Sequence, residues 1–202
     1  MTTLSILIPT TTKRAELFFA PMVDHLQEQI DILKCKDVEI LGFLDNYKYT
    51  IGEKRNKLLD LACGKFTLFI DDDDRVTQNF LQEIMGCIRK NPDADCIVYD
   101  MICTINGCRT IHSRFGIEYE YSKMEPWTND NCNIRSVVPE KWFGKPSHNM
   151  VWAARISKGI RFPDKNAGED FDWVAKAWPK IKKQSRIDKV IYYYDAVLGK
   201  EY

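Results

Sequence analysis

The sequence lacks an excess of charge of either sign, a long apolar segment and any CxxC pair of cysteines. Lysine plus arginine and aspartate plus glutamate each number 29 among 202 residues, so the formal net charge is zero. A neutral protein has no global positive field that would attract nucleic acid or an anionic membrane. We therefore expect no nucleic-acid partner, and a few local cations must hold any anionic ligand.

The short apolar runs and the cysteines exclude further classes of protein. No apolar run approaches the ~18 residues that a membrane-spanning helix needs, and no basic leader precedes the first run. The seven cysteines are odd in number and form no CxxC pair, so we predict neither a zinc site nor a disulfide framework. Free thiols are typical of a reducing compartment. These absences predict a cytoplasmic protein without a membrane span.

The first half of the chain alternates buried-looking strands with helical patterns. Apolar runs predict strands at Leu4–Ile8, Val38–Leu44 and Phe66–Ile70. Apolar spacing from Leu17 to Leu33 predicts the first connecting helix, Gly64 is placed for a left-handed residue after the second, and Thr77 is placed to cap the third. A repeated β-α pattern of this kind predicts an α/β fold with a parallel, helix-flanked sheet.

The second half predicts that the sheet becomes mixed. Asn106-Gly107 separates two strand-like runs and is a strong signal for a two-residue hairpin. Residues 118–145 lack periodicity and are expected to be mostly loop. Residues 149–156 and 189–197 read as strands, and a short helix begins near Gly168. Because a strand-like run lies so close to residue 202, the domain could also form part of a longer chain.

Four consecutive aspartates, Asp71 to Asp74, directly follow the third strand. The carboxyl ends of strands in an open α/β sheet face the crevice where ligands bind. If the extended conformation continues, Asp71 and Asp73 share one face and Asp72 and Asp74 the other. Crowded carboxylates need a cation, and Mg²⁺ and Mn²⁺ bind one or two carboxylates together with water and phosphate oxygens. The run thus predicts a metal site, the alternative being a solvated acidic turn before a helix.

Other acid-rich motifs fit this run less well. An EF-hand loop begun at Asp71 or Asp72 would place Val76 or Thr77 where glycine is required. The GxxxxGK[ST] motif of a P-loop is absent. The DxDx[TV] motif of haloacid-dehalogenase-type phosphatases is mismatched at Arg75, and two strand-helix units precede the run here. A metal-dependent phosphatase remains the less favoured alternative.

Four segments together resemble family 2 glycosyltransferases of the GT-A fold. They are LSILIPTTTKR from Leu4, FLDN from Phe43, GEKRNKLLDLACGKFTLFIDDDD from Gly52, and GEDFDW from Gly168. The opening segment is also similar to the N-terminal domain of glycosyltransferases that modify the capsids of large chlorella viruses, which would place the chain in a host cytoplasm. The resemblance implies one GT-A domain over 1–202, with a nucleotide-binding half over about 1–95 and an acceptor-binding half over about 96–202.

The resemblance also implies which residues bind a nucleotide-sugar. Pro9 and Thr10 would line the nucleotide pocket, Asp45 would contact the uracil of a UDP-sugar, and Arg55 would lie against the base or the diphosphate. Arginine suits this role because its planar fork of donors matches phosphate oxygens. The alternatives are that Arg55 is an exposed helix charge and that Asp45 is an ordinary turn residue after a strand.

Within the acid run, the resemblance assigns an early aspartate to the ribose and a later one to the metal. Asp73 is the expected ligand of Mn²⁺ or Mg²⁺, with Asp71 as a second ligand and Asp72 at the ribose. Four adjacent aspartates leave this register uncertain by one residue. His148 lies where some relatives have a further metal or phosphate contact, but a single histidine is more often structural, so it is left out of the site.

The segment GEDFDW supplies the expected catalytic acids. The resemblance makes Asp170 the base that deprotonates the acceptor hydroxyl, with Glu169 orienting the acceptor and Asp172 as a second choice for the base. It implies inversion at the anomeric carbon, with a glycan or glycoprotein as acceptor. The alternatives are that these acids only cap and solvate a helix, and that the chain is a catalytically silent nucleotide-sugar-binding module.

Overall fold

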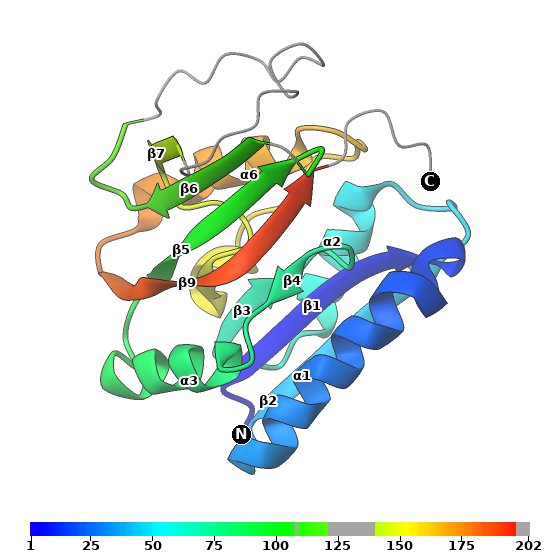
Figure 1. Cartoon of the computed structure of the whole chain (residues 1–202), viewed down its shortest axis with the longest axis horizontal. Coiled ribbons are helices and arrows are strands. Elements are labelled where there is room, and N and C mark those ends of the chain that lie inside the picture. The colour runs from blue at the N-terminus through cyan, green and yellow to red at the C-terminus, as the bar shows by residue number, and fades with distance from the viewer. Residues whose placement is uncertain (108, 121–139, 197–202) are drawn as a thin grey trace.

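The computed structural model describes residues 1–107, 109–120 and 140–196, and one mixed β-sheet organises them (Figure 1). The strands are β1 (Leu4–Thr11), β2 (Val38–Asp45), β3 (Phe66–Phe69), β4 (Arg75–Val76), β5 (Cys96–Ile105), β6 (Arg109–Phe115), β7 (Glu140–Gly144), β8 (Val151–Ala153) and β9 (Gln184–Ala196). The helices are α1 (Ala20–Leu33), α2 (Ile51–Leu61), α3 (Phe80–Lys90), α5 (Ala154–Ser157) and α6 (Glu169–Ala177). Short turns η1 (Thr12–Arg14), η2 (Ala15–Phe19) and η3 (Trp178–Lys180) adjoin α1 and α6.

The strand order is β2-β1-β3-β8-β5-β6-β7, with β9 beside β5 and β4 beside β9. Parallel pairing joins β1 to β2 and β3, as the β-α pattern predicts, whereas β8 runs antiparallel to both β3 and β5. Because β2 and β3 flank β1 on opposite sides, right-handed crossovers place α1 and α2 on opposite faces of the sheet (Figure 1). The central strand β1 is therefore covered on both faces, and its residues from Leu4 to Thr10 are buried.

The first helix begins later than its apolar spacing predicts. Residues 12–19 form the 3-10 turn η1 and the π-helical turn η2, and regular α-helix starts at Ala20. Pro21 explains the boundary, because a residue without a backbone N–H fits only the first turn of a helix. Leu17, predicted to face the core, is 70% exposed, whereas Met22 and Leu26 are buried.

Two further expectations about helix ends are wrong. Gly64 does not have the positive φ of a left-handed cap, since the glycines with positive φ in the described residues are Gly107 and Gly168. A Cβ at Gly64 would lie 2.6 Å from the backbone nitrogen of Ser5, so close approach to β1 is what requires glycine there. Thr77 does not cap α3, because Asn79 occupies the N-cap position.

In the second half, the predicted hairpin is confirmed. Asn106 and Gly107 have φ values of 50° and 68°, the conformation of a type I′ turn, and they join the antiparallel strands β5 and β6. Part of the predicted loop 118–145 is instead β7, which pairs in parallel with β6, and residues 121–139 lie outside the described part of the chain. The predicted strand 149–156 is divided into β8 and α5. None of the helices in the described ranges has the length and apolar character that crossing a membrane requires.

Asp95 fastens the start of β5 to α5 and to the residues just before β9. Its Oδ2 accepts from the backbone N–H groups of Lys182 and Lys183, both at 2.8 Å, and its Oδ1 lies 2.7 Å from Nη2 of Arg155. Burial raises the pKa of Asp95, but these contacts outweigh burial and lower it below the usual value. The stabilisation is therefore present above the unfolded-state pKa and is lost as pH falls through the lower folded-state value.

We expect Asp95→Asn to lower the free energy of unfolding by about 1–3 kcal/mol at neutral pH, because a charged acceptor of several buried donors is lost. The deficit relative to the wild type should narrow below about pH 4, where the unfolded-state carboxyl takes up a proton. Urea denaturation at neutral and acidic pH measures both values. Asp93→Asn is the matched control, since exposed Asp93 also pairs with Lys183 and should change stability far less. A deficit independent of pH would contradict this account.

Candidate active site

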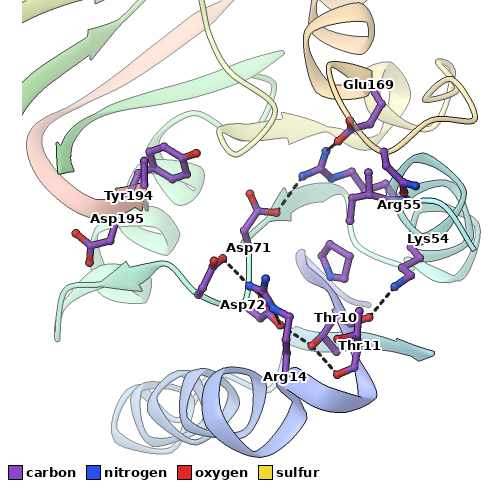
Figure 2. A pocket seen from close by; sticks show the side chains of 15 residues that line it. Thr10, Thr11, Arg14, Lys54, Arg55, Asp71, Asp72, Glu169, Tyr194 and Asp195 are labelled. Atoms are coloured by element: carbon purple, nitrogen blue, oxygen red, sulfur yellow. Dashed lines mark hydrogen bonds and ion pairs between the residues drawn. The ribbon is translucent and has the colours of Figure 1, made fainter. Parts of the chain in front are cut away.

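The elements that carry the predicted motifs meet around one cavity of about 450 Å³. The ends of β1 and β9, the acid run after β3 and the first turns of α2 and α6 all contribute to its walls (Figure 2). Seven of the residues predicted for the site line it: Pro9, Thr10, Arg55, Asp71, Asp72, Asp73 and Glu169. Asp45 and Asp170 do not.

Within this cavity, the acid run is a turn and not an extension of β3. The strand ends at Phe69, and the backbone N–H of Asp74 donates to the carbonyl of Asp71 at 3.1 Å. The predicted alternation of faces is therefore wrong, because the strand geometry on which it depends has ended. Asp71, Asp72 and Asp73 all line the cavity.

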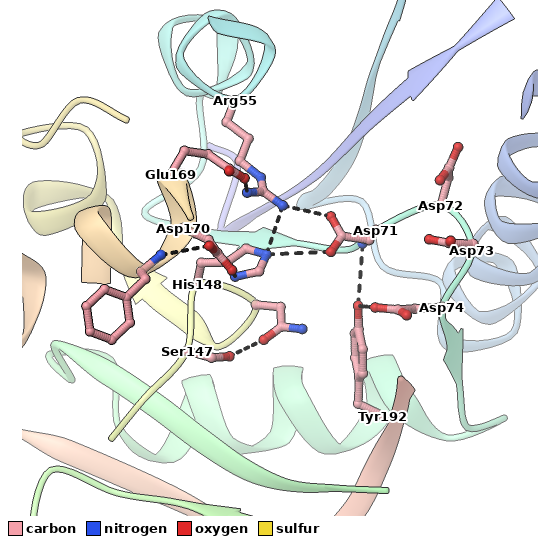
Figure 3. Close-up of polar contacts among 12 residues, drawn as sticks. Arg55, Asp71, Asp72, Asp73, Asp74, Ser147, His148, Glu169, Asp170 and Tyr192 are labelled. Atoms are coloured by element: carbon pink, nitrogen blue, oxygen red, sulfur yellow. Dashed lines mark hydrogen bonds and ion pairs between the residues drawn. The ribbon is translucent and has the colours of Figure 1, made fainter. Parts of the chain in front are cut away.

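Asp74 points away from the cavity into the protein. It accepts a hydrogen bond from Oη of Tyr192, and Tyr192 Oη in turn accepts from the backbone N–H of Asp71 at 3.4 Å (Figure 3). Burial raises the pKa of Asp74 well above its usual value, and the charge of Asp71 adds to this shift. Asp74 is thus a buried carboxyl that fastens the turn and a structural part of the site.

Asp72 and Asp73 are both in contact with Arg14, which the sequence interpretation did not select. Asp72 Oδ2 accepts from Thr10 Oγ1 at 2.5 Å and from Arg14 Nε at 3.1 Å. Arg14 Nη2 lies 2.8 Å from Asp73 Oδ1. Burial raises the pKa of Asp72, although the bonds from Arg14 and Thr10 act in the opposite direction. The sequence signal that could have identified Arg14 is its position as a basic residue shortly after the first strand.

Lys54 is a second cation that the sequence interpretation missed. It is buried, donates to the carbonyl of Thr10 at 3.0 Å and forms an ion pair with Asp45. Asp45 Oδ2 also accepts from the backbone N–H of Tyr49 at 2.8 Å. Burial raises the pKa of Asp45, but these contacts lower it overall. Asp45 thus fixes Lys54 at the cavity wall, and its predicted contact with uracil stays a prediction.

Arg55 links the acid run to the start of α6. Its Nη2 donates to Asp71 Oδ1 at 2.9 Å, and its Nη1 pairs with Glu169 (Figure 3). The guanidinium also lies over the rings of Phe69 and Phe162, at 5.9 and 5.5 Å from their centroids. Burial acts against ionisation of Asp71, but the charge of Arg55 holds the pKa of Asp71 well below its usual range. Arg55 lines the cavity with Nη1 and Nη2 committed to protein carboxylates, whereas its buried Nε has no hydrogen-bond partner among the described residues.

His148, left out of the predicted site, lies between two of its acids. Its Nε2 is 3.1 Å from Arg55 Nη2 and 3.7 Å from Asp71 Oδ2, and its Nδ1 is 3.5 Å from Asp170 Oδ2. Nε2 thus faces both a donor, Arg55, and an acceptor, Asp71, while Nδ1 faces the carboxylate of Asp170. Asp172, the second choice for the base, instead pairs with Lys165 at 2.6 Å.

A second cavity of about 330 Å³ adjoins the first. Asp71 and Tyr194 line both cavities, while Asp170 and His148 line only the second. Two adjacent acids on α6 therefore line different cavities, Glu169 the first and Asp170 the second. The other walls of the second cavity include Met101, Cys103, Ile111, Ser113, Phe115, Trp142, Ser147 and Asn149.

Three solved structures of TarS from S. aureus are similar to this chain. TarS 1–349 in complex with UDP-GlcNAc aligns with a TM-score of 0.63 and 19% identity, over 98% of this chain and 60% of that chain. The complex with UDP aligns with a TM-score of 0.62 and 20% identity, over 96% of this chain and 61% of that chain. TarS 1–349 aligns with a TM-score of 0.61 and 19% identity, over 96% of this chain and 60% of that chain. The chain has the GT-A fold. No protein-family model matches it, and no curated protein matches its sequence.

The chain spans about 60% of the length of these TarS structures. Within its GT-A domain, the acid run suits a metal ion that needs few protein ligands. No group of three or more His, Cys, Asp or Glu side chains in the described ranges is arranged to hold a metal by itself. Mg²⁺ and Mn²⁺ commonly bind one or two carboxylates and complete their shell with water and phosphate. Arg14 already contacts Asp72 and Asp73. These contacts indicate that the carboxylate oxygens of the two aspartates favour a positive partner.

Proposed function

We propose that this chain is a metal-dependent, inverting glycosyltransferase that moves a sugar from a UDP-sugar to a hydroxyl of a glycan or glycoprotein. The observation that supports this most is the pair of adjoining cavities that share Asp71. One carries acids and buried cations suited to a nucleotide diphosphate, and the other carries Asp170. The TarS complexes with UDP and UDP-GlcNAc on the same fold favour UDP as the nucleotide.

The first cavity is the proposed donor site. Thr10 and Pro9 form one wall for the nucleoside, and Asp72 is the proposed partner of the ribose. Lys54 is held at the cavity wall by Asp45, where its ammonium offsets the negative charge of a diphosphate. Residues 1–95 thus form most of the donor half, and the second cavity belongs mainly to the acceptor half over 96–202.

Mn²⁺ or Mg²⁺ is the proposed cofactor, with Asp73 as the first ligand and Asp71 as the second. When bound, such an ion stabilises the charge that develops on the leaving diphosphate as a Lewis acid. Asp73 and Asp71 both line the cavity, and each has an arginine on one oxygen. Asp73 suits the first role because its partner Arg14 belongs to the short turn η1, whereas Arg55, the partner of Asp71, is buried in α2.

Asp170 is the proposed general base. The acceptor hydroxyl enters the second cavity, its oxygen forms a bond to the anomeric carbon, and the bond from that carbon to the phosphate oxygen breaks. The hydroxyl proton passes to Asp170, and attack from the side opposite the diphosphate inverts the anomeric configuration. His148 holds Asp170 toward the acceptor, and Arg55 fixes the start of α6 through Glu169.

A thermal-shift panel tests donor binding. We expect UDP and UDP-GlcNAc with Mn²⁺ to raise the melting temperature, because a ligand at about 100 times its Kd stabilises the folded state by about 2.7 kcal/mol. ADP with Mn²⁺ and UDP with EDTA are the controls, and both should give smaller shifts. A panel in which no nucleotide raises the melting temperature would overturn the proposal. If the protein binds UDP but neither transfers the sugar nor slowly hydrolyses the UDP-sugar, it is instead a catalytically silent binding module.

A further inference from the structure

Arg14 occupies the part of the acid run where the divalent cation is proposed to bind. Its Nη2 contacts Asp73 Oδ1 at 2.8 Å. The same Nη2 also contacts Asp72 Oδ1, and Nε donates to Asp72 Oδ2 (Figure 2). The side chain is only 17% exposed, and its guanidinium lies 5.2 Å from the centroid of the Phe18 ring. A cation of the protein is thus already in contact with two of the four carboxylates.

Arg14 and a divalent cation cannot keep the same contacts with Asp73. Both are positive, and one carboxylate in contact with both would bring like charges within a few ångströms of each other. Arg14 belongs to η1, a single 3-10 turn followed by the π-helical turn η2, and neither turn contains a buried residue. Short, irregular helical turns of this kind are marginally stable and often mark functional sites. The turn η1 can therefore move without disturbing the core, while Phe19 of η2 stays packed against the core.

We propose that Arg14 is the resident counter-ion of the donor site and couples the binding of the divalent cation to that of the nucleotide. The cation displaces Arg14 from Asp73, and the diphosphate gives the displaced guanidinium a new anionic partner with matching geometry. Without the nucleotide, the divalent cation binds weakly, because Arg14 loses its contact with Asp73 and no diphosphate replaces it. This inference rests on the proposed function of the same cavity.

The test is the affinity of the purified protein for Mn²⁺, measured from the electron paramagnetic resonance signal of free Mn²⁺ with and without UDP. Without UDP, we expect Arg14→Ala to bind Mn²⁺ about tenfold more tightly than the wild type, a coupling of ordinary size. UDP should lower the Kd of Mn²⁺ by about tenfold in the wild type and by much less in Arg14→Ala.

Arg75→Ala is the matched control. Arg75 follows the same acids directly, but its Nη2 pairs with Asp195 Oδ2 at 2.7 Å and not with Asp72 or Asp73. Arg75→Ala changes the net charge of the protein as much as Arg14→Ala does, but it removes no contact with Asp72 or Asp73. The Kd of Arg75→Ala for Mn²⁺ should therefore remain close to that of the wild type. An equal gain in affinity in both variants would reduce the effect to general electrostatics and overturn the inference.

Arg14→Lys provides a second test in case Arg14→Ala does not fold. Lysine keeps the charge but lacks the planar fork that reaches both carboxylates, so its Mn²⁺ affinity without UDP should lie above that of the wild type. Wild-type affinity in the folded Arg14 variants would overturn the role of Arg14. Failure of every protein to bind Mn²⁺ even with UDP is a different result, which would overturn the metal-dependent function itself.

Discussion

Asp170→Asn should lower kcat for sugar transfer by about 10²- to 10⁴-fold, the usual contribution of a general base. Asparagine has nearly the same shape but cannot accept a proton at neutral pH. The Asp170 side chain is 42% exposed and lines the second cavity, so an acceptor hydroxyl can reach it. Steady-state transfer or hydrolysis of the donor measures kcat, and the thermal shift by UDP with Mn²⁺ should be unchanged, because Asp170 lies outside the first cavity.

Asp172→Asn is the matched control for this prediction. Asp172 lies two residues further along α6 and is 46% exposed, but its carboxylate pairs with Lys165. Its variant should retain most of the activity. Loss of transfer in Asp172→Asn with wild-type turnover in Asp170→Asn would exchange the two roles. Wild-type turnover in both would remove the general base from α6.

Local patterns in the sequence predict the strands and the hairpin well, because those elements depend on neighbouring residues. The apolar runs of β1 and β3 and the Asn106-Gly107 turn each specify their own conformation. Leu17 shows the limit of this reasoning, since its spacing fits a helix face but Pro21 delays the α-helix by a turn. Gly64 shows another, because the need for glycine comes from a distant strand.

The polar contacts of the site could not be predicted in the same way. Arg14 and Asp72 are 58 positions apart, and Arg55 and Glu169 are 114 apart. Only the folded sheet brings such residues together. The motif GEKRN indicates a cation near the donor but not which one, since Lys54 and Arg55 are neighbours on α2 with different partners.

Arg55→Ala should lower the free energy of unfolding by about 3–5 kcal/mol, the usual cost of removing one partner of a buried ion pair. Arg55 is 4% exposed, and its removal leaves Asp71 and Glu169 without their shared cation. The deficit should be largest near neutral pH. In the wild type, Arg55 lowers the pKa of Asp71, so this stabilisation is present above the unfolded-state pKa and is lost as pH falls through the folded-state value.

In the variant, Asp71 keeps its burial without that cation, so protonation should relieve part of the cost. The deficit relative to the wild type is therefore expected to narrow as Asp71 of the variant takes up its proton on acidification, before Asp71 of the wild type does, and urea denaturation at several pH values can measure this. Arg161→Ala is the matched control, because Arg161 and Asp60 form a pair in which each side chain is 57% exposed. Such exposed pairs contribute about 0–1 kcal/mol. A loss in Arg55→Ala no larger than in Arg161→Ala, or one that widens in acid, would show that Arg55 does not hold the acid run to α6.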